Sequence, residues 1–224
     1  MTATTAPLNV VVLVSGRGSN LKAIAAQADA GALPIAITAV VSDRADAGAL
    51  DWARERGIAA VVLSPREYAD RTAYGRALGD IVAGMQPDLV VLAGFMRILS
   101  DEFVLRFLGR MLNIHPSLLP KYPGLHTHRR ALEAGDAEHG ASVHFVTPEL
   151  DGGPVVLQAR VPVLPGDDED TLAARVLRQE HVIYPQVVSW FAQGRLGLRD
   201  GAVWLDGTRL ETPLQLAGPT QETG

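Results

Sequence analysis

The chain has 224 residues, of which 47% are hydrophobic and 20% are charged, and its formal net charge is −5. This length and apolar content suffice for one well-packed domain, and a small negative charge without a basic block argues against bulk binding to nucleic acid or membrane surfaces. Cysteine is absent, which excludes disulfides, thiolate metal sites and a cysteine nucleophile.

The start of the chain does not resemble a targeting segment. Residues 1–7 lack the basic flank and apolar core of a signal peptide. The longest apolar runs, such as 89–93, are too short to span a bilayer. We therefore expect a cytoplasmic protein with one domain over residues 8–210, and flexible termini at 1–7 and at the polar, proline-containing stretch 211–224.

In the first half of the chain, short apolar runs alternate with helix-like stretches. Leu21, Ile24, Ala25 and Ala28 form an apolar stripe with helical spacing, which Gly31 closes. Strand, helix, strand, helix at this spacing is typical of a parallel α/β sheet. Strands are expected at 9–14, 35–41, 59–63 and 88–93, and further helices at 48–57 and 68–85.

The second half of the chain is less regular. A long helix is expected at 171–194, because the acidic stretch 167–170 suits the positive end of a helix dipole. An Asp-Gly pair at 206–207 indicates the turn of a small hairpin over 202–210. The other expected elements are a helix at 100–110 and strands at 141–147 and 154–163 around the loop 148–153.

A glycine-containing turn, Ser-Gly-Arg-Gly-Ser-Asn-Leu at 15–21, follows the first expected strand and opens a helix. Glycine lets the backbone bend tightly, and the free amides of a helix start attract an anion. Leu21 holds the place of the third glycine of a dinucleotide fingerprint, so one phosphate group is favoured over a dinucleotide. The alternative is an ordinary strand-to-helix turn, capped by Ser19 or Asn20.

The segment 112–128 combines an amide and an imidazole in a stiff, proline-rich stretch. Asn113 and His115 are two residues apart, so an extended strand places both side chains on one face. An amide that donates to an oxyanion, beside an imidazole that moves a proton, suits acyl transfer. A structural histidine is the alternative, and a metal site with His126 and His128 is disfavoured by the lack of ligands at helical spacing.

Asp151 lies in the segment Glu-Leu-Asp-Gly-Gly-Pro at 149–154. Asp-Gly-Gly is usually no more than a turn. A carboxylate held near an imidazole nevertheless stabilises the charged imidazolium. Spacing alone does not show whether the fold brings Asp151 to His115.

Two further places are candidates for ligand binding. Met96, Ile98 and Leu99 follow the strand that ends near Gly94, where they form either an apolar slot for a flat ring or plain core packing. Glu180 falls in line with the apolar residues of the long helix, so it faces inward and needs a partner. A ligand is one option for that partner, and Arg71 is the other.

Four segments resemble the phosphoribosylglycinamide formyltransferases of purine biosynthesis, in order, from about residue 8 to residue 210. The stretch Asn-Ile-His-Pro-Ser-Leu-Leu-Pro is similar to all folate-dependent formyl hydrolases and transferases, and its continuation Lys-Tyr-Pro-Gly-Leu-His-Thr-His is much more specific to the glycinamide enzymes. The resemblance implies a doubly wound α/β fold with a mostly parallel twisted sheet, helices on both faces and folate near its C-terminal edge. The four segments are 11–21, 87–100, 113–128 and 140–154.

The resemblance also implies a role for each matching residue. Asn113, His115 and Asp151 are the implied catalytic trio. The implied phosphate contacts are Gly18, Ser19, Asn20 and Arg71, and Glu180 would contact the ribose or glycinamide end. The pterin pocket is implied to consist of Met96, Arg97, Ile98 and Leu99 on one side, and Thr147, Pro148, Glu149, Leu150 and Asp151 on the other.

The implied reaction transfers a formyl group from 10-formyltetrahydrofolate to the amino group of 5'-phosphoribosylglycinamide through a tetrahedral intermediate. It needs small-molecule substrates only, with no metal, nucleic acid or membrane, in a monomer or homodimer. A 10-formyltetrahydrofolate hydrolase and a non-catalytic folate-binding protein are the alternatives. A hydrolase usually adds an N-terminal regulatory domain, and a mere binding protein has no reason to keep all three catalytic residue types.

Overall fold

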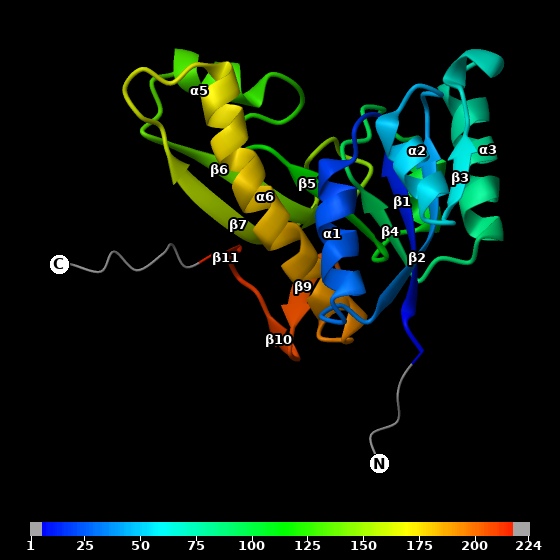
Figure 1. Ribbon diagram of the computed structural model, residues 1–224. Helices are drawn as coiled ribbons and strands as arrows, with labels where there is room; N and C mark the ends of the chain where they lie inside the picture. Colours follow the sequence, from blue (N-terminus) through cyan, green and yellow to red (C-terminus); the bar gives the residue numbers. More distant parts are fainter. Residues whose placement is uncertain (1–5, 217–224) are drawn as a thin grey trace.

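The computed structural model describes residues 6–216 and places the first four strands side by side (Figure 1). Together with four later strands they form one eight-stranded sheet in the order β11-β7-β6-β5-β4-β1-β2-β3. Its strands are β1 (Leu8–Val14), β2 (Ile35–Ser42), β3 (Ala59–Val62), β4 (Leu89–Leu92), β5 (Met111–His115), β6 (Glu138–Phe145), β7 (Val155–Pro162) and β11 (Leu214–Gln215). A second sheet contains β8 (Leu196–Arg199), β9 (Ala202–Leu205) and β10 (Thr208–Arg209).

The large sheet has a parallel part and an antiparallel part. Strands β3, β2, β1, β4 and β5 run parallel to one another, whereas β6 is antiparallel to both β5 and β7. Strand β5 therefore joins the two parts and belongs to the antiparallel part through its pairing with β6. The chain winds outward from β1 to β3 and then crosses back to β4 on the other side of β1. The predicted doubly wound α/β fold is therefore confirmed, and the strand order reverses between β1 and β4, which is where such sheets bind ligands.

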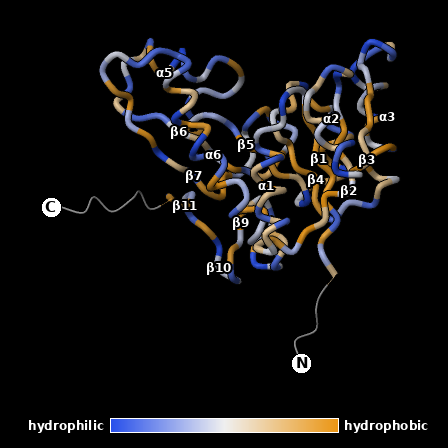
Figure 2. The backbone as a smooth tube through the Cα atoms, viewed as in Figure 1, coloured by the Kyte–Doolittle hydropathy of each residue, from blue (hydrophilic) through white to orange (hydrophobic). Residues whose placement is uncertain are grey.

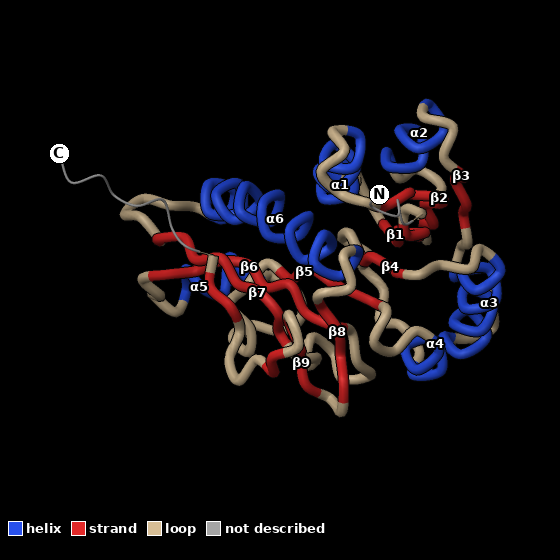
Figure 3. Tube along the Cα trace, turned by 90° about the horizontal axis from the view of Figure 1, so that it is seen from below, coloured by secondary structure: helices blue, strands red, loops and turns tan. Residues whose placement is uncertain are grey.

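Helices cover both faces of the sheet (Figure 3). Strand β1 shows why: Val10, Val12 and Val14 face one core, while Val11 and Leu13 face the other, and all are fully buried. The hydrophobic residues gather accordingly along the central strands (Figure 2). Helices α1 (Ser19–Asp29), α2 (Gly48–Glu55) and α6 (Glu169–Ala192) pack on the first core, and α3 (Arg71–Gly84) and α4 (Asp101–Arg106) pack on the second.

Helix α6 runs along the antiparallel part of the sheet and contacts β6, β7 and α1 (Figure 1). It begins two residues before the expected start, because Asp168 and Thr171 form a capping box. The hydroxyl of Tyr184, which is fully buried, lies 2.9 Å from the carbonyl oxygens of Leu92 and Leu112. These contacts fasten α6 to the sheet at the end of β4 and near the start of β5.

Several elements differ from those expected. Helix α3 begins at Arg71 rather than at residue 68, because the Asp70 side chain caps it, and a short 3-10 turn, η1 (Pro65–Glu67), precedes it. Helix α4 ends at Arg106 rather than at residue 110, because a turn follows it in which Gly109, three residues later, has φ 76°. Helix α5 (Thr127–Glu133) and strand β8 were not expected at all.

The C-terminal stretch is the last difference. We expected residues 211–224 to be flexible, yet Leu214 and Gln215 pair with Leu157 and Gln158 of β7. The Gln215 side chain also donates to the Gln158 side chain at 3.0 Å. Residues 1–5 and 217–224, which belong to the predicted flexible termini, lie outside the described residues.

Candidate active site

The candidate site lies where the loops after β1 and β4 meet, at the reversal of the strand order. The two loops are joined by backbone and side-chain hydrogen bonds: Ser15 N–H donates to the Gly94 carbonyl at 3.0 Å, and Met96 N–H donates to the Ser15 hydroxyl at 2.8 Å. This pairing sets the turn before α1 beside the segment 95–99, so both expected binding loops lie on the same edge of the sheet.

The turn before α1 depends on Gly18. Its φ of 69° is in the left-handed region, and a Cβ at this position would lie 2.8 Å from the Cβ of Ala49 in α2. Gly18 is itself the N-cap of α1, with no side-chain cap bond, so the predicted alternative of a Ser19 or Asn20 cap is wrong. The first amides of α1 therefore have no side-chain acceptor and can receive an anion.

Asn20 and Glu180 form a buried polar pair between α1 and α6. The Asn20 Nδ2 atom donates to Glu180 Oε2 at 2.7 Å, and each residue is only 7% exposed. Burial raises the pKa of the Glu180 carboxyl, whereas the bond from Asn20 lowers it. Glu180 thus faces inward as predicted, but its protein partner is Asn20 and not Arg71.

The Asn20 Oδ1 atom is buried and has no hydrogen-bond partner among the described residues. A buried amide oxygen without a donor costs free energy unless a ligand or water satisfies it. Arg71, by contrast, is exposed at the first residue of α3, and no ion pair joins it to another described residue. The described structure therefore joins Asn20, which follows Gly18 in the turn, to Glu180, and no hydrogen bond or ion pair joins Arg71 to these described residues.

Asn113 of β5 lies directly opposite His144 of β6. Its Nδ2 atom is 3.0 Å from His144 Nε2, and His144 Nδ1 is 2.9 Å from the Phe145 carbonyl oxygen. Because a carbonyl only accepts, His144 carries its proton on Nδ1 and accepts the Asn113 amide at Nε2. Burial lowers the pKa of His144 to about 4, so the ring stays neutral and keeps this acceptor.

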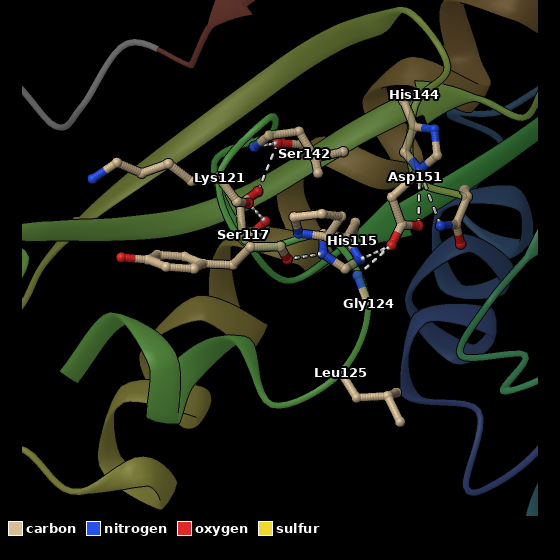
Figure 4. A network of polar contacts seen from close by, with 12 residues as sticks. His115, Ser117, Lys121, Gly124, Leu125, Ser142, His144 and Asp151 are labelled. Carbon is tan, nitrogen blue, oxygen red and sulfur yellow. Dashed lines mark hydrogen bonds and ion pairs between the residues drawn. The ribbon is translucent and has the colours of Figure 1, made fainter. Parts of the chain in front are cut away.

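His115, also on β5, is buried between two acceptors (Figure 4). Its Nε2 atom lies 2.8 Å from the Tyr122 carbonyl oxygen, and its Nδ1 atom lies 3.4 Å from Asp151 Oδ2. A neutral ring can donate from only one nitrogen, whereas the imidazolium donates from both. Both ring nitrogens of His115 therefore face acceptors, the Tyr122 carbonyl and the Asp151 carboxylate, and the Asn113 amide lies on the same strand.

The turn that contains Asp151 brings it to His115, which spacing alone could not show. Asp151 has φ 50°, and the Gly124 N–H donates to its Oδ2 atom at 2.8 Å. Gly153 allows this turn to close, because a Cβ there would lie 1.8 Å from the Phe145 carbonyl oxygen. The loop after β6 and the loop after β5 are thus fastened to each other through one carboxylate (Figure 4).

The expected pterin loops present apolar side chains to solvent. Met96 is 68% exposed, Ile98 56% and Leu150 52%, whereas Leu99 packs partly against the second core. Plain core packing therefore describes Leu99 but not Met96 or Ile98. Exposed apolar side chains in loops that flank a polar site are typical of ligand binding.

The remaining histidines do not gather around His115. His126 is exposed, and His128 Nδ1 lies 3.2 Å from His139 Nε2 instead. Among residues 6–216, no group of three histidine, aspartate or glutamate side chains is arranged to hold a metal ion. Within the same range, no helix has the length and apolar character to cross a membrane.

Two functional contacts were missed from the sequence. His144 occupies an expected strand, but its place opposite Asn113 depends on the register of β5 and β6. Tyr122 contributes a backbone carbonyl, for which a sequence carries no signal. Alternation along 141–147 could have placed His144 on the face opposite Ala141, Val143 and Phe145, but not against a particular partner.

Several known proteins are similar to this chain over most of its length. The formyl transferase family matches residues 8–188. Phosphoribosylglycinamide formyltransferase of Escherichia coli is 59% identical over 203 residues, which cover 91% of this chain and 96% of that protein. The enzyme of the same name from Haemophilus influenzae is 47% identical over 90% of this chain and 95% of its own. A solved phosphoribosylglycinamide formyltransferase from Coxiella burnetii superposes with a TM-score of 0.90 at 48% identity, over 94% of this chain and all of that one.

Proposed function

The chain belongs to the formyl transferase family, and from this premise we propose that it is a folate-dependent formyltransferase. It transfers the formyl group of 10-formyltetrahydrofolate to the amino group of 5'-phosphoribosylglycinamide, a step of purine biosynthesis. The observation that carries the proposal is the His115 ring held between the Tyr122 carbonyl and the Asp151 carboxylate, beside the Asn113 amide. The high identity to enzymes with this name over nearly their whole length supports the choice of acceptor.

The turn before α1 receives the phosphate of the acceptor in this proposal. Gly18, Ser19 and Asn20 present the first amides of a helix of 11 residues, which favour an anion. Glu180 then contacts the ribose or glycinamide end, and the free Asn20 Oδ1 atom accepts from the same ligand. Arg71 supplies a second phosphate contact, since no ion pair with another described residue occupies its guanidinium.

The folate lies between two loops in this proposal. Met96, Arg97, Ile98 and Leu99 line one side of the pterin, largely through backbone groups. The segment Thr147 to Asp151 closes the other side. The exposed apolar side chains of Met96, Ile98 and Leu150 then lose their contact with water when the ring binds.

The chemistry follows from charge development at the formyl carbon. The acceptor amine attacks this carbon, and the carbonyl oxygen becomes an oxyanion. The Asn113 amide has two N–H groups, so one binds His144 and the other is free to donate to the oxyanion together with the charged His115 ring. Asp151 keeps His115 oriented and charged. The charged ring gives a proton to N10 as the bond from N10 to the formyl carbon breaks, and it then takes up the proton that the attacking amine loses, so His115 is the proton carrier between amine and folate. Neither a metal ion nor a covalent enzyme intermediate is needed.

A folate-release assay tests the proposal. Purified protein is mixed with 10-formyltetrahydrofolate, with and without 5'-phosphoribosylglycinamide, and the release of tetrahydrofolate is followed. Release that depends on the ribonucleotide is the expected result. Equal release without the acceptor would instead show a hydrolase, and binding of folate without release would show a non-catalytic protein. We place the activity in the cytoplasm, in a monomer or homodimer.

A further inference from the structure

We infer that Tyr122 and Asp136 are positioning residues, which hold the catalytic His115 ring in place through the carbonyl group of Tyr122. The inference rests on the proposed formyl transfer, because it assigns His115 as the group to be positioned. Tyr122 lies in the loop after β5, and Asp136 lies between α5 and β6. Neither side chain touches His115 Nδ1, so each acts through the main chain.

The contacts form one continuous line. Asp136 Oδ2 accepts a hydrogen bond from the Tyr122 hydroxyl at 2.8 Å, and the Tyr122 carbonyl accepts one from His115 Nε2 at 2.8 Å. Asp136 is itself anchored, because its N–H donates to the Ala131 carbonyl at 3.1 Å and both its oxygens lie 2.9 Å from Lys121 Nζ. The line thus runs from the start of β6 to the imidazole on β5.

The backbone of Tyr122 needs such an anchor. Its φ of 57° is in the left-handed region, which a tyrosine adopts only at a cost in free energy. A conformation of this kind persists where its surroundings impose it. The Tyr122 ring is held on one face by the guanidinium of Arg130, 5.1 Å from its centroid, and at its far end by Asp136. The hydroxyl bond therefore helps to impose the backbone angle that aims the carbonyl at His115.

The orientation of the Tyr122 carbonyl group decides which His115 nitrogen takes part in proton transfer. With the carbonyl in place, Nε2 donates to it, and Nδ1 is the nitrogen that faces Asp151. If the carbonyl turns away, His115 loses one of two fixed contacts and its ring can rotate. The His115 ring, which is both a donor to the oxyanion and the proton carrier, is then misplaced, while the loops that bind the two substrates stay unchanged.

The test compares four single variants and one double variant in the full chain. Tyr122→Phe removes the hydroxyl but keeps the ring and its contact with Arg130. Asp136→Ala removes the acceptor, whereas Asp136→Asn keeps an oxygen that can accept from the Tyr122 hydroxyl. Lys121→Gln is the control for loss of charge, because it removes an ammonium on a side chain that is 59% exposed, where an ion pair is worth little. It removes the contacts of this ammonium with Asp136 and with the Tyr122 ring, 5.8 Å from its centroid, but leaves the bond from the Tyr122 hydroxyl to Asp136 in place.

We expect Tyr122→Phe and Asp136→Ala each to lower kcat by about 10-fold with little change in either KM. The kcat of the double variant Tyr122→Phe/Asp136→Ala should be no lower than that of either single variant, because both changes break the same chain of contacts. Asp136→Asn should restore most of the rate, and Lys121→Gln should leave it unchanged. A raised KM with an unchanged kcat would overturn the inference, and so would losses in kcat that add up in the double variant.

A spectroscopic readout separates this inference from the proposed function. Nitrogen-15 NMR of the histidine rings should show His115 Nε2 protonated in the wild-type protein, with this signal altered in Tyr122→Phe. That result does not depend on which reaction the protein catalyses. An unaltered His115 signal in Tyr122→Phe would refute the positioning role, even if formyl transfer were established. Absence of formyl transfer by the wild-type protein would refute the proposed function instead.

Discussion

The parallel and antiparallel parts of the sheet contribute to the site in different ways. The parallel part contributes backbone groups, namely the amides that follow Gly18 at the start of α1. No larger residue can replace Gly18 without a clash. The antiparallel part offers side chains: Asn113 and His115 on β5, each fixed by a residue from another segment. Binding of an anion needs only a well-placed backbone, whereas proton transfer needs side chains that are oriented by further contacts.

This difference predicts how each part fails when it is changed. A change in the antiparallel part should lower the rate while the fold and substrate binding persist. A change in the turn before α1 should alter stability and binding of the acceptor together, because backbone geometry serves both. Four experiments examine this contrast.

The largest effect is expected from His115→Ala. Loss of the proton carrier and of one oxyanion donor should slow formyl transfer by about 10²- to 10⁴-fold. The melting temperature and folate binding should change little, and both are measured beside the rate. Asp151→Asn should slow transfer in the same direction. Turnover near the wild-type level in purified His115→Ala would remove His115 from the mechanism.

Gly18→Ala should disturb the parallel part. The left-handed φ costs an alanine about 1–2 kcal/mol, and the contact of its Cβ with Ala49 adds about 1–3 kcal/mol of overpacking. Gly31→Ala is the matched control, because Gly31 has φ 73° but nothing within 4 Å of the added Cβ. Urea unfolding should therefore show a clearly larger loss for Gly18→Ala, together with a raised KM for the ribonucleotide. Equal losses would mean that the contact with Ala49 does not matter.

His144 should make the stability of the antiparallel part depend on pH. Its folded-state pKa of about 4 is below the ordinary value of 6.5, so the unfolded chain binds the proton more tightly. The contribution of the neutral His144 ring to the free energy of unfolding is complete above pH 6.5. It is lost as the pH falls toward 4, and the total loss is on the order of 3 kcal/mol. Unfolding of His144→Gln, compared with wild type across this range, should show a shallower dependence. If the free energy of unfolding depended on pH equally in His144→Gln and in wild type, that result would contradict the burial of a neutral His144 ring.

Glu180→Gln should have the smallest effect on stability, with the opposite dependence on pH. Because burial raises the pKa of this carboxyl above 4.5, the folded state is disfavoured as the pH rises from 4.5 through the raised value. The variant should melt at a higher temperature than wild type at pH 7 and at the same temperature below pH 4.5. Its KM for the ribonucleotide should rise about 10-fold if the charge contacts the acceptor. An unchanged KM would leave Glu180 with a structural role only.

The regular elements were the easiest to predict from sequence. Strand β1 and helix α1 follow from local patterns, because residues 9–14 form a continuous run rich in Val and Leu and the stripe through Leu21 repeats at helical spacing. The turn at Gly18 and the pair Asn113 and His115 also carry local signals. In these cases the residues that determine the structure are close together in the chain.

The rest depended on contacts between distant segments. Glu180 was expected to face inward, but Asn20, its partner, lies 160 positions earlier in the chain. Likewise, His144 meets Asn113 only through the register of two strands, and Asp151 reaches His115 only through a turn after β6. Local patterns report neither register nor loop closure, and strand β11 was missed because two residues are too few for any period.

The bond of Tyr184 to the sheet has a consequence for insertions and deletions. Glu180 and Tyr184 are one helical turn apart on the same face of α6, and Tyr184 is fixed at the end of β4 and near the start of β5. One residue added or removed between them would rotate Glu180 by about 100° around the helix axis while Tyr184 stays in place. Changes of chain length are therefore confined to the loops on either side of α6, and a new acceptor must be accommodated by replacing side chains rather than by lengthening the helix.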